Sequence, residues 1–575
     1  MKIIRIRIHN YRSIIDAEIE AHDYLMFVGA NNSGKSNVIN ALRTFYEDTK
    51  WTTDDFPKTG TKDEDSWIEL IFKLTVDEWS GIADKYKENV TDQQITLRRY
   101  FKGDKVKAKQ SNIYAIVNED EDSDLFYGAK NVSTAKCGNV VYIPALTTPG
   151  EQMKTTGPSP LRNMLNFMLK KVVSKSKAYE ELGTAFQNLN SEAKQENGFL
   201  SEIAKPINAA LNQWDVKIDL SVNPISPEDI SKSLVKYAFV DMMLGEAAFN
   251  LDRFGHGFQR SVIYELIRLA PSFKDDRSMG KKEFNPDFTL ILFEEPEAFL
   301  HPAQQENMAY HLRRLGADSE QQVFITTHSP IFVGKNADDL CQIVRLFRKD
   351  GVSTLYQIEE SKKEVLFRSG GDFLTVLQHY VDNDSIDDSQ KAKAKGLINN
   401  PPPSEEIALQ NEKYRFQLWL DSDRASMFFA DKVLLVEGAT EKALFNYLLA
   451  NNWYKSNNER VLVVDSFGKY NFHRFLALFE SFGIYHGIMF DNDNEKNEHQ
   501  VINKFIRDKK NAFTLAKPFE FSGCLEKHLN LTLSGRGDQK PLQVLKSIED
   551  ETITHEQLTE LYNDFCNCLA ITRGN

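Results

Sequence analysis

A glycine-rich loop between an apolar strand and a helix constrains the fold of this chain more than any other sequence feature. The loop has the sequence Gly29-Ala-Asn-Asn-Ser-Gly34-Lys35-Ser36 and fits the pattern G-x-x-x-x-G-K-[ST]. An apolar run at 25–28 precedes it, and apolar residues at helical spacing follow it within 37–46. Backbone N–H groups of such a loop, at the N-terminus of a helix, converge on phosphate oxygens. The sequence therefore predicts an α/β domain that binds a nucleotide.

The residue types in this loop indicate a magnesium-bound nucleoside triphosphate, and we expect ATP. Lys35 would contact the β- and γ-phosphates, and Ser36 would help to hold Mg²⁺. The predicted nucleotide-binding residues of the loop are Gly29, Asn31, Asn32, Ser33, Gly34, Lys35, Ser36 and Asn37.

Two later strands are expected to bring acidic and imidazole groups to the same site. The apolar strand 289–293 ends at Glu294 and Glu295. Carboxylates there bind Mg²⁺ or orient water, so we assign Glu294 to the metal and Glu295 to the catalytic base. His328 follows the next strand, 322–326, and this place favours a catalytic role over the structural role of most lone histidines.

A second glycine segment opens another apolar helix. It has the sequence Phe254-Gly-His-Gly-Phe-Gln-Arg260. Because glycines at a helix N-terminus leave backbone N–H groups open to phosphate, we expect Gly255, Gly257 and Gln259 to contact nucleotide.

The C-terminal third has a second set of strand-end acids. One apolar strand, 432–436, ends at Glu437, and another, 486–490, ends at Asp491 and Asp493. Parallel strands that end side by side would place these carboxylates on one rim, where they need cations to offset their repulsion. Two metal ions roughly 4 Å apart at such a rim clamp the attacking and leaving oxygens of a phosphodiester. The alternative is that they are ordinary solvated acids.

Further residues complete the predicted metal site. Glu441 lies one helical turn beyond Glu437, which would let it bind the same Mg²⁺, or Mn²⁺ or Ca²⁺ in its place. Lys540 is our candidate for offsetting charge on the reacting phosphate, with Arg536 as the second choice. Glu526 is a candidate additional metal ligand.

The N-terminal motifs together resemble those of the ABC-type ATPases of the SMC and DNA-repair class. In that family two heads enclose ATP, with the glycine signature of one head facing the phosphate loop of the other. The resemblance therefore implies a homodimer. This chain departs from the pattern at Glu294, where many members have Asp, and it has no heptad run for the long coiled coil. The helical segment 158–245 stands in its place.

The segments around Glu437 and Asp491 resemble a Toprim domain, the metal-binding module of topoisomerases, primases and some nucleases. The order of ATPase and then Toprim domain resembles the OLD (overcoming lysogenization defect) family of nucleases, over about 1–350 and 416–545. This resemblance implies two-metal cleavage of DNA, assembly into homodimers or larger oligomers, and a role in bacterial defence against phage. Some relatives act with a helicase, as in Gabija systems, and others with a retron reverse transcriptase and its DNA.

We therefore expect an α/β fold: an ABC/SMC-like ATPase head with a helical insertion, followed by a C-terminal parallel-sheet Toprim domain. The expected parts are the head, 1–157 and 246–380; a dimerising helical insertion, 158–245; a linker, 381–415; the Toprim domain, 416–545; and a helical end, 546–575.

Composition limits the surroundings and partners of the protein. The net charge of −13 means that DNA contact requires a local basic patch, for which 94–109 is one candidate and a solvated strand pair the alternative. The five cysteines form no C-x-x-C pair, which favours reduced thiols in the cytoplasm. We expect no signal peptide and no membrane span.

The predicted function is an ATP-controlled, metal-dependent DNA endonuclease. The alternatives are a DNA-repair or recombination ATPase and a signalling ATPase, with a Toprim domain that does not cut.

Overall fold

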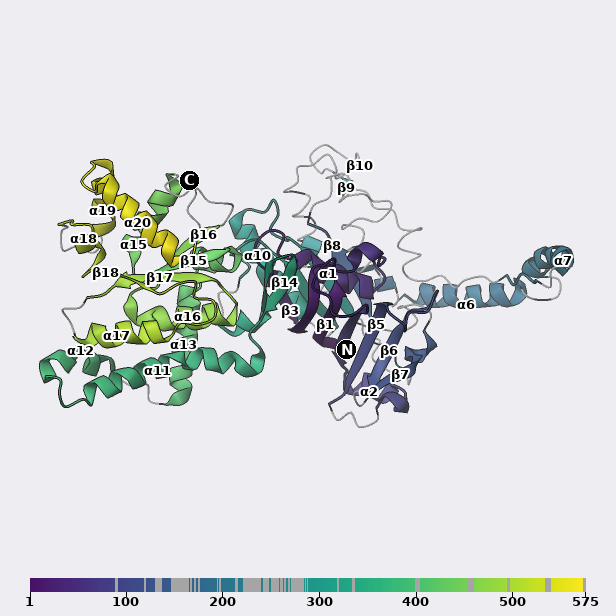
Figure 1. The fold of residues 1–575 in the computed structure, drawn as a ribbon. Coiled ribbons are helices and arrows are strands. Elements are labelled where there is room, and N and C mark those ends of the chain that lie inside the picture. Colours follow the sequence, from purple (N-terminus) through teal and green to yellow (C-terminus); the bar gives the residue numbers. More distant parts are fainter. Residues whose placement is uncertain are drawn as a thin grey trace.

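The computed structural model describes most of the chain (Figure 1). The described residues are 1–87, 92–117, 120–129, 137–145, 176–193, 198–212, 216–220, 239–240, 248–249, 288–317, 320–333, 337–398, 404–451, 460–493, 497–532 and 539–571, with isolated positions within 165–286.

The N-terminal part contains an antiparallel sheet of six strands in the order β2-β1-β4-β5-β6-β7. Its strands are β1 (Lys2–Tyr11), β2 (Ile14–Glu20), β4 (Ser66–Lys73), β5 (Gln94–Lys102), β6 (Ile113–Val117) and β7 (Asp120–Leu125). Most of the acidic run 118–124 belongs to strand β7, which pairs antiparallel with β6 and so forms one arm of a hairpin.

A second six-stranded sheet has the order β14-β13-β3-β12-β11-β8, and only β14 runs antiparallel to its neighbour. Its strands are β3 (Tyr24–Val28), β8 (Asn139–Ile143), β11 (Thr289–Glu294), β12 (Gln321–Thr326), β13 (Ile343–Lys349) and β14 (Val352–Tyr356). Strands β3, β11 and β12 are buried along their whole length, as continuous apolar runs in a sheet covered on both faces should be.

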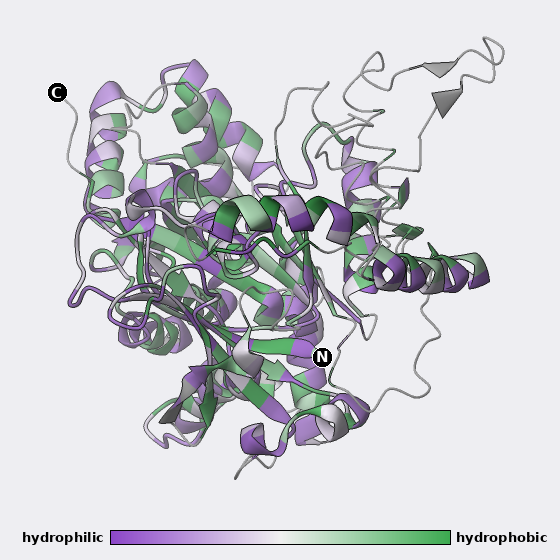
Figure 2. Cartoon of the chain, turned by 90° about the vertical axis from the view of Figure 1, so that its right-hand side faces the viewer, coloured by the Kyte–Doolittle hydropathy of each residue, from purple (hydrophilic) through white to green (hydrophobic). Residues whose placement is uncertain are grey.

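This parallel sheet is the middle layer of the ATPase part. Leu25 and Phe27 of β3 pack with helix α1 (Lys35–Phe45) and the antiparallel sheet. Met26 and Val28, on the other face of β3, pack with helix α10 (Pro302–Gly316). Figure 2 shows hydrophobic residues gathered along the interior strands, with hydrophilic and hydrophobic residues mixed on the helices around them. The phosphate loop therefore starts from the strand between two cores.

Within the segment expected to be a helical insertion, the described residues include helices α6 (Lys177–Ala193) and α7 (Phe199–Leu211), which project away from the two sheets (Figure 1). The shorter described elements of the N-terminal part are α2 (Val76–Gly81), β9 (Phe239–Val240) and β10 (Ala248–Phe249).

The C-terminal part has a parallel sheet in the order β16-β15-β17-β18. Its strands are β15 (Lys432–Val436), β16 (Val461–Asp465), β17 (His486–Asp491) and β18 (Phe519–Phe521). Its helices are α14 (Ser422–Ala425), α15 (Ala439–Ala450), α16 (Phe472–Ser481), α17 (Asn497–Asp508), α18 (Leu525–His528), α19 (Lys540–Glu549) and α20 (His555–Cys568). The predicted α/β alternation is confirmed.

The expected linker at 381–415 is wrong for the residues that the structure describes. Helix α11 (Lys363–Val381) is followed by α12 (Asp388–Ile398) and α13 (Glu405–Trp419). Arg474 of α16 donates to both carboxylate oxygens of Glu412 in α13, at 2.6 and 2.8 Å, and the pair is buried. The Lys-Ala composition that suggested a linker also has high helix propensity, and tertiary packing stabilises the helices.

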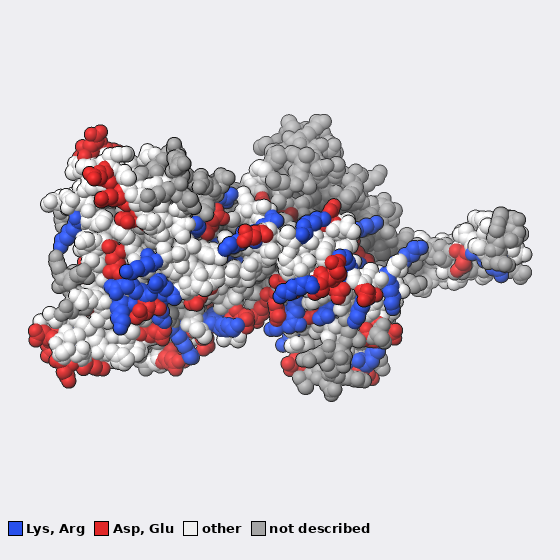
Figure 3. All heavy atoms as spheres, in the orientation of Figure 1, with Lys and Arg blue, Asp and Glu red and all other residues white. Residues whose placement is uncertain are grey.

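The candidate basic patch at 94–109 uses its arginines inside the domain. Arg98 donates to Glu69 at 2.6 and 2.9 Å. Arg99 is buried, donates to the Phe45 carbonyl at 2.6 Å and pairs with Glu47 at 2.8 Å. The structure therefore favours the alternative of a strand pair, and Figure 3 shows acidic and basic side chains interspersed on the face drawn.

Arg345 of β13 joins the ATPase sheet to the C-terminal part. Its side chain is fully buried, and its guanidinium donates to four backbone carbonyls at 2.8–3.3 Å: those of Phe428, Ala430, Phe482 and Gly483. Burial lowers its pKa to about 10, so it stays charged at neutral pH. One guanidinium therefore satisfies backbone acceptors from two segments of the C-terminal part.

We predict that Arg345→Met lowers the free energy of unfolding by about 3 kcal/mol, because it leaves buried carbonyls without donors. Urea unfolding measures the change. Arg5→Met is the matched control, since Arg5 is exposed and, among the described residues, pairs with exposed Glu18, and it should change stability by less than about 0.5 kcal/mol. Equal losses of unfolding free energy in the two variants would contradict the role of Arg345 in joining the two parts.

Candidate nucleotide site and candidate metal centre

The phosphate loop follows β3 and requires glycine at the two glycine positions of its sequence pattern, residues 29 and 34. Gly29 has φ 142° and Gly34 has φ 107°. A Cβ on Gly29 would lie 2.3 Å from the Leu346 carbonyl oxygen, and one on Gly34 would lie 2.4 Å from Ser353 Oγ. The loop therefore lies tightly against β13 and β14, and α1 begins at Lys35.

Lys35 is buried beneath the loop. Its ammonium donates to the carbonyls of Gly29 and Ala30, both at 2.9 Å. Burial lowers its pKa to about 8, although the charges of Glu295 and Glu297 oppose that shift. Its position under the loop is where a phosphate-binding lysine is expected.

The other predicted loop residues divide into two groups. Asn31, Asn32 and Ser36 are exposed, although Asn32 accepts from Arg348 at 2.9 Å. By contrast, Asn37 and Ser33 are at least partly buried: Asn37 donates to Ser13 at 2.8 Å, and the Ser33 carbonyl accepts from Ser353 at 2.7 Å. The contacts of this second group hold the loop against the rest of the domain.

Glu294, Glu295 and His328 meet at the ends of β11 and β12. Tyr142 donates to one oxygen of Glu294 at 2.8 Å, and the other buried oxygen has no hydrogen-bond partner among the described residues. Such an oxygen fits Mg²⁺ or its water. His328 Nε2 lies 3.6 Å from Glu295 Oε1.

His328 is neutral at physiological pH, because burial and nearby positive charge lower its pKa to about 4. The residue that our sequence analysis left without a role is Glu297. Its carboxylate accepts from the His328 backbone N–H at 2.6 Å and so ties the two strand ends together. The acidic motif that continues through Pro296 to Glu297 was the available signal.

Gly255, Gly257 and Gln259 of the second glycine segment lie outside the described residues, as does Arg536.

The predicted metal ligands converge at the carboxyl ends of β15 and β17. Glu437 Oε2 accepts from the Asp491 backbone N–H at 3.3 Å, and Asp491 Oδ1 accepts from the Leu525 N–H at 3.0 Å. Glu441 Oε2 accepts from the Gly438 N–H at 3.1 Å. Carboxylates far apart in the sequence therefore share one rim of the sheet.

A buried lysine that our assignment of roles omitted lies among them. The Lys469 ammonium is 3.0 Å from Asp493 Oδ2 and 3.8 Å from Glu437 Oε2, and it also donates to the Asp491 carbonyl. His499 Nδ1 lies 3.0 Å from the same Asp493 oxygen. The hydrogen bond from His499, and then those from Lys469, hold the pKa of Asp493 well below its usual range.

The remaining carboxylates have too little positive charge around them. Burial, and then the charges of Glu441, Glu437 and Asp493, raise the pKa of Asp491 to about 8. Burial is also the main reason why the pKa of Glu441 is about 7. Buried oxygens with uncompensated charge fit a divalent cation. Among the described residues, however, no group of three His, Cys, Asp or Glu side chains is already arranged to hold a metal ion.

Lys540 and Glu526 lie beside this rim and form an ion pair of 2.7 Å. Burial would raise the pKa of Glu526, but the hydrogen bonds from Lys540 and Cys524 keep it lowered. Asp465, at the end of β16, does not join the rim. It accepts two hydrogen bonds of 2.8 Å from Arg424 and pairs with Lys442 at 2.8 Å.

Comparisons with known proteins agree with this arrangement. Residues 1–138 and 160–333 match the family model described as AAA ATPase domain. That match spans more than half of the sequence. The chain belongs to the AAA ATPase domain family. Residues 428–493 match the model described as Overcoming lysogenization defect protein-like, TOPRIM domain. The predicted union of an ATPase with an OLD-type Toprim domain is confirmed.

Three curated nucleases are similar to this AAA ATPase family member. The Old nuclease of Escherichia phage P2 is 24% identical over 86% of this chain and 77% of that protein. The endonuclease GajA of Bacillus cereus (strain VD045) is 21% identical over 86% of this chain and 75% of that protein. The OLD nuclease of Thermus scotoductus is 26% identical over 42% of this chain and 36% of that protein. The chain accordingly combines an AAA ATPase domain with a Toprim domain of the OLD-like type, and it is similar to these nucleases in sequence.

Solved structures of SMC heads also match. The SMC head domain from Thermotoga maritima has a TM-score of 0.30 and 14% identity, over 62% of this chain and 100% of that one.

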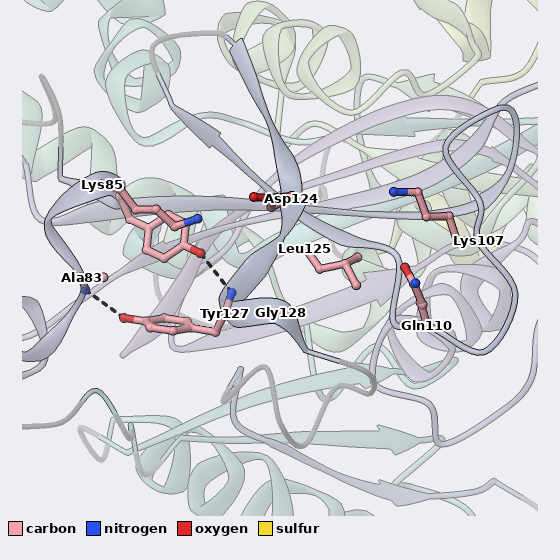
Figure 4. A pocket seen from close by; sticks show the side chains of 9 residues that line it. Ala83, Lys85, Lys107, Gln110, Asp124, Leu125, Tyr127 and Gly128 are labelled. Atoms are coloured by element: carbon pink, nitrogen blue, oxygen red, sulfur yellow. Dashed lines mark hydrogen bonds between the residues drawn. The ribbon is translucent and has the colours of Figure 1, made fainter.

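A surface pocket of about 520 Å³ lies apart from both sites, on the outer edge of the antiparallel sheet (Figure 4). Tyr127 closes one side, where its hydroxyl accepts from the Ala83 N–H at 2.8 Å and its own N–H donates to Tyr86 at 2.9 Å.

The described helices include none that is long and apolar enough to cross a membrane.

The pKa of Lys35 predicts the pH dependence of ATP binding. Without phosphate the ammonium loses its proton near pH 8, whereas bound phosphate raises its pKa and keeps the proton. Binding above that pH therefore takes up a proton, and the ATP Kd should rise about tenfold between about pH 7 and pH 9. Calorimetric titration measures it. Lys35→Arg stays charged and should show a flatter profile. An identical pH dependence of the ATP Kd in the parent and in Lys35→Arg would contradict the assignment of Lys35 to phosphate binding.

Proposed function

We propose that this protein is an ATP-controlled, divalent-metal-dependent DNA endonuclease. The observation that carries the proposal is the convergence of Glu437, Asp491 and Asp493 at one sheet edge, in a chain that also has a phosphate loop. The nuclease names of its relatives support a nucleic acid as the substrate, and DNA is our candidate.

Glu437, Glu441, Asp491, Asp493 and Glu526 would hold the metal, with Mg²⁺ as the first candidate and Mn²⁺ or Ca²⁺ as substitutes. Bound metal supplies a polarised phosphate and an activated water. Lys540 would approach the reacting phosphate once it is released from Glu526, and its ammonium would offset charge there. Lys469 and His499 would position Asp493, which they already contact.

At the nucleotide site, Ser36 and Glu294 would hold the magnesium of ATP while Lys35 binds the outer phosphates. Glu295 would accept a proton from the attacking water. Neutral His328, 3.6 Å away, would orient the Glu295 carboxylate or the water between them. Gly255, Gly257 and Gln259 would contact the ATP of a second copy.

We propose a homodimer or larger assembly through the heads and the insertion, acting on DNA in the cytoplasm as a defence against phage. Helix α7 exposes Phe199, Ile203 and Ile207, which are 46%, 51% and 37% accessible and lie on one helical face. All five cysteines are free thiols, as a reducing compartment requires. An accompanying helicase, or a reverse transcriptase with its DNA, is the expected kind of partner.

Removal of either strand-end carboxylate should abolish DNA cutting. Glu437→Gln and Asp491→Asn should each slow the nicking or linearisation of plasmid by about a hundredfold or more in Mg²⁺ or Mn²⁺, because the remaining acids hold the metal poorly. Gel electrophoresis measures the products. Glu480→Gln, an exposed position on α16, is the matched control and should cut like the parent. If the parent with ATP and metal leaves plasmid intact, the non-cutting ATPase is the better description.

The two sites should be separable. Lys35→Ala should lose ATP turnover by about a hundredfold or more, since the outer phosphates lose their lysine, while circular dichroism shows an intact fold. Phosphate release measures turnover. Glu437→Gln should hydrolyse ATP at the parental rate. Unchanged turnover in Lys35→Ala would remove the proposed nucleotide site and leave the metal site standing.

A further inference from the structure

The loop that follows β16 holds an exposed aromatic side chain next to the rim of metal ligands. Ser466 Oγ donates to the Glu437 carbonyl at 3.2 Å, and the Gly468 N–H donates to the same carbonyl at 2.8 Å. Phe467 stands between these two residues, and Lys469, whose ammonium lies among the rim carboxylates, follows them. Hydrogen bonds on either side of Phe467 therefore fix it at the sheet edge where Glu437 emerges.

The side chain of Phe467 faces solvent, unlike its aromatic neighbours. It is 50% accessible, whereas the three phenylalanines of α16, which begins five residues later, are at most 3% accessible. Its φ is 57°, in the left-handed region that residues with a Cβ seldom adopt. Strained backbone of this kind persists where a loop holds a functional side chain. An outward ring on such a loop, beside a reaction site, points to contact with a ligand.

Contacts on one face hold the ring in place. The guanidinium carbon of Arg424 lies 3.8 Å from the centroid of the Phe467 ring. That guanidinium is buried and is itself fixed by two hydrogen bonds of 2.8 Å to Asp465. The ring of Trp419 lies alongside, with centroids 6.4 Å apart and planes inclined by 29°. Because the guanidinium covers one face of the Phe467 ring, the opposite face is the one that a ligand can reach.

A fixed aromatic ring with one open face fits a nucleobase. Every base has a flat π-face, and proteins hold unpaired bases by stacking them on aromatic side chains, without reading their sequence. An aliphatic ligand would need a groove that closes around it, whereas stacking needs only the open face. A strand whose phosphate lies at Glu437 also carries its bases close to Phe467.

We propose that Phe467 stacks on an unpaired base of the nucleic-acid strand held at the metal rim, and so positions the phosphate that is cut. The proposal rests on the proposed nuclease function and adds a substrate contact to it. Since the residues on both sides of Phe467 bind the Glu437 carbonyl, a base stacked there is fixed relative to a metal ligand. The contact favours substrates with an unstacked or single-stranded base beside the cut over a uniform duplex.

The test measures binding of a fluorescein-labelled single-stranded DNA oligonucleotide to the full chain in Mg²⁺, by fluorescence anisotropy. Every protein also carries Asp491→Asn, so that the strand stays intact. Phe467→Ala and Phe467→Leu should each raise the Kd about tenfold, because both lose the stacking face. Phe467→Trp keeps that face and should stay within about twofold of the background. Tyr310→Ala, which removes an exposed aromatic ring from α10, is the matched control and should bind like the background.

The leucine variant separates stacking from packing. Leucine still covers the Arg424 side chain, so a purely structural role of Phe467 predicts background affinity in Phe467→Leu, and that result overturns the proposal. Equal affinity in Phe467→Ala and the background overturns it as well, as does a background protein that does not bind the strand. Failure of the nuclease function has a different signature. Plasmid left intact by the parent with ATP and metal, together with weakened strand binding in Phe467→Ala and Phe467→Leu, would remove the cutting role and keep the base contact.

Discussion

Both candidate sites depend on one constraint: parallel strands deliver the residues that follow them to a single edge of a sheet. In the ATPase part β3, β11 and β12 place Lys35, Glu295 and His328 together. In the Toprim part β15 and β17 do the same for Glu437 and Asp491. Because these strands are buried along all or nearly all of their length, their register is held by the cores on both faces. Charged groups can then remain crowded at the edge, since packing elsewhere stabilises the arrangement.

The connection between the two sheets depends on a buried arginine. Arg345 pairs with Val28 in the register of β13 and β3, one residue before the phosphate loop, and its side chain binds carbonyls of the C-terminal part. This contact is buried and satisfied, so it fixes the relation of the parts. The same strand that borders the phosphate loop therefore also carries the contact to the C-terminal part.

Strand ends were predictable from sequence because their physical signal is local. The apolar run 432–436 ends at Glu437, and β15 has the same bounds in the structure. Helices 388–398 and 405–419 were missed because a polar, lysine-rich segment next to prolines has little periodicity, and its packing partner Arg474 is distant in sequence. Lys469 and His499 were missed as site residues for a related reason. Neither residue stands in a sequence pattern that indicates a site, and only the folded sheet brings them into contact with Asp493.

The Lys469 ammonium also explains how the rim is stable with so many acids. The lysine side chain is 1% exposed, and its ammonium lies 3.0 Å from Asp493 Oδ2 and 3.8 Å from Glu437 Oε2, so it offsets the negative charge of both carboxylates. Among the described residues, the carboxylates of Asp491 and Glu441 form no ion pair, and burial together with the charges of neighbouring carboxylates raises their pKa values. The rim is therefore asymmetric, because the lysine offsets charge on one half, whereas the other half keeps buried carboxylates whose repulsion a divalent ion would relieve.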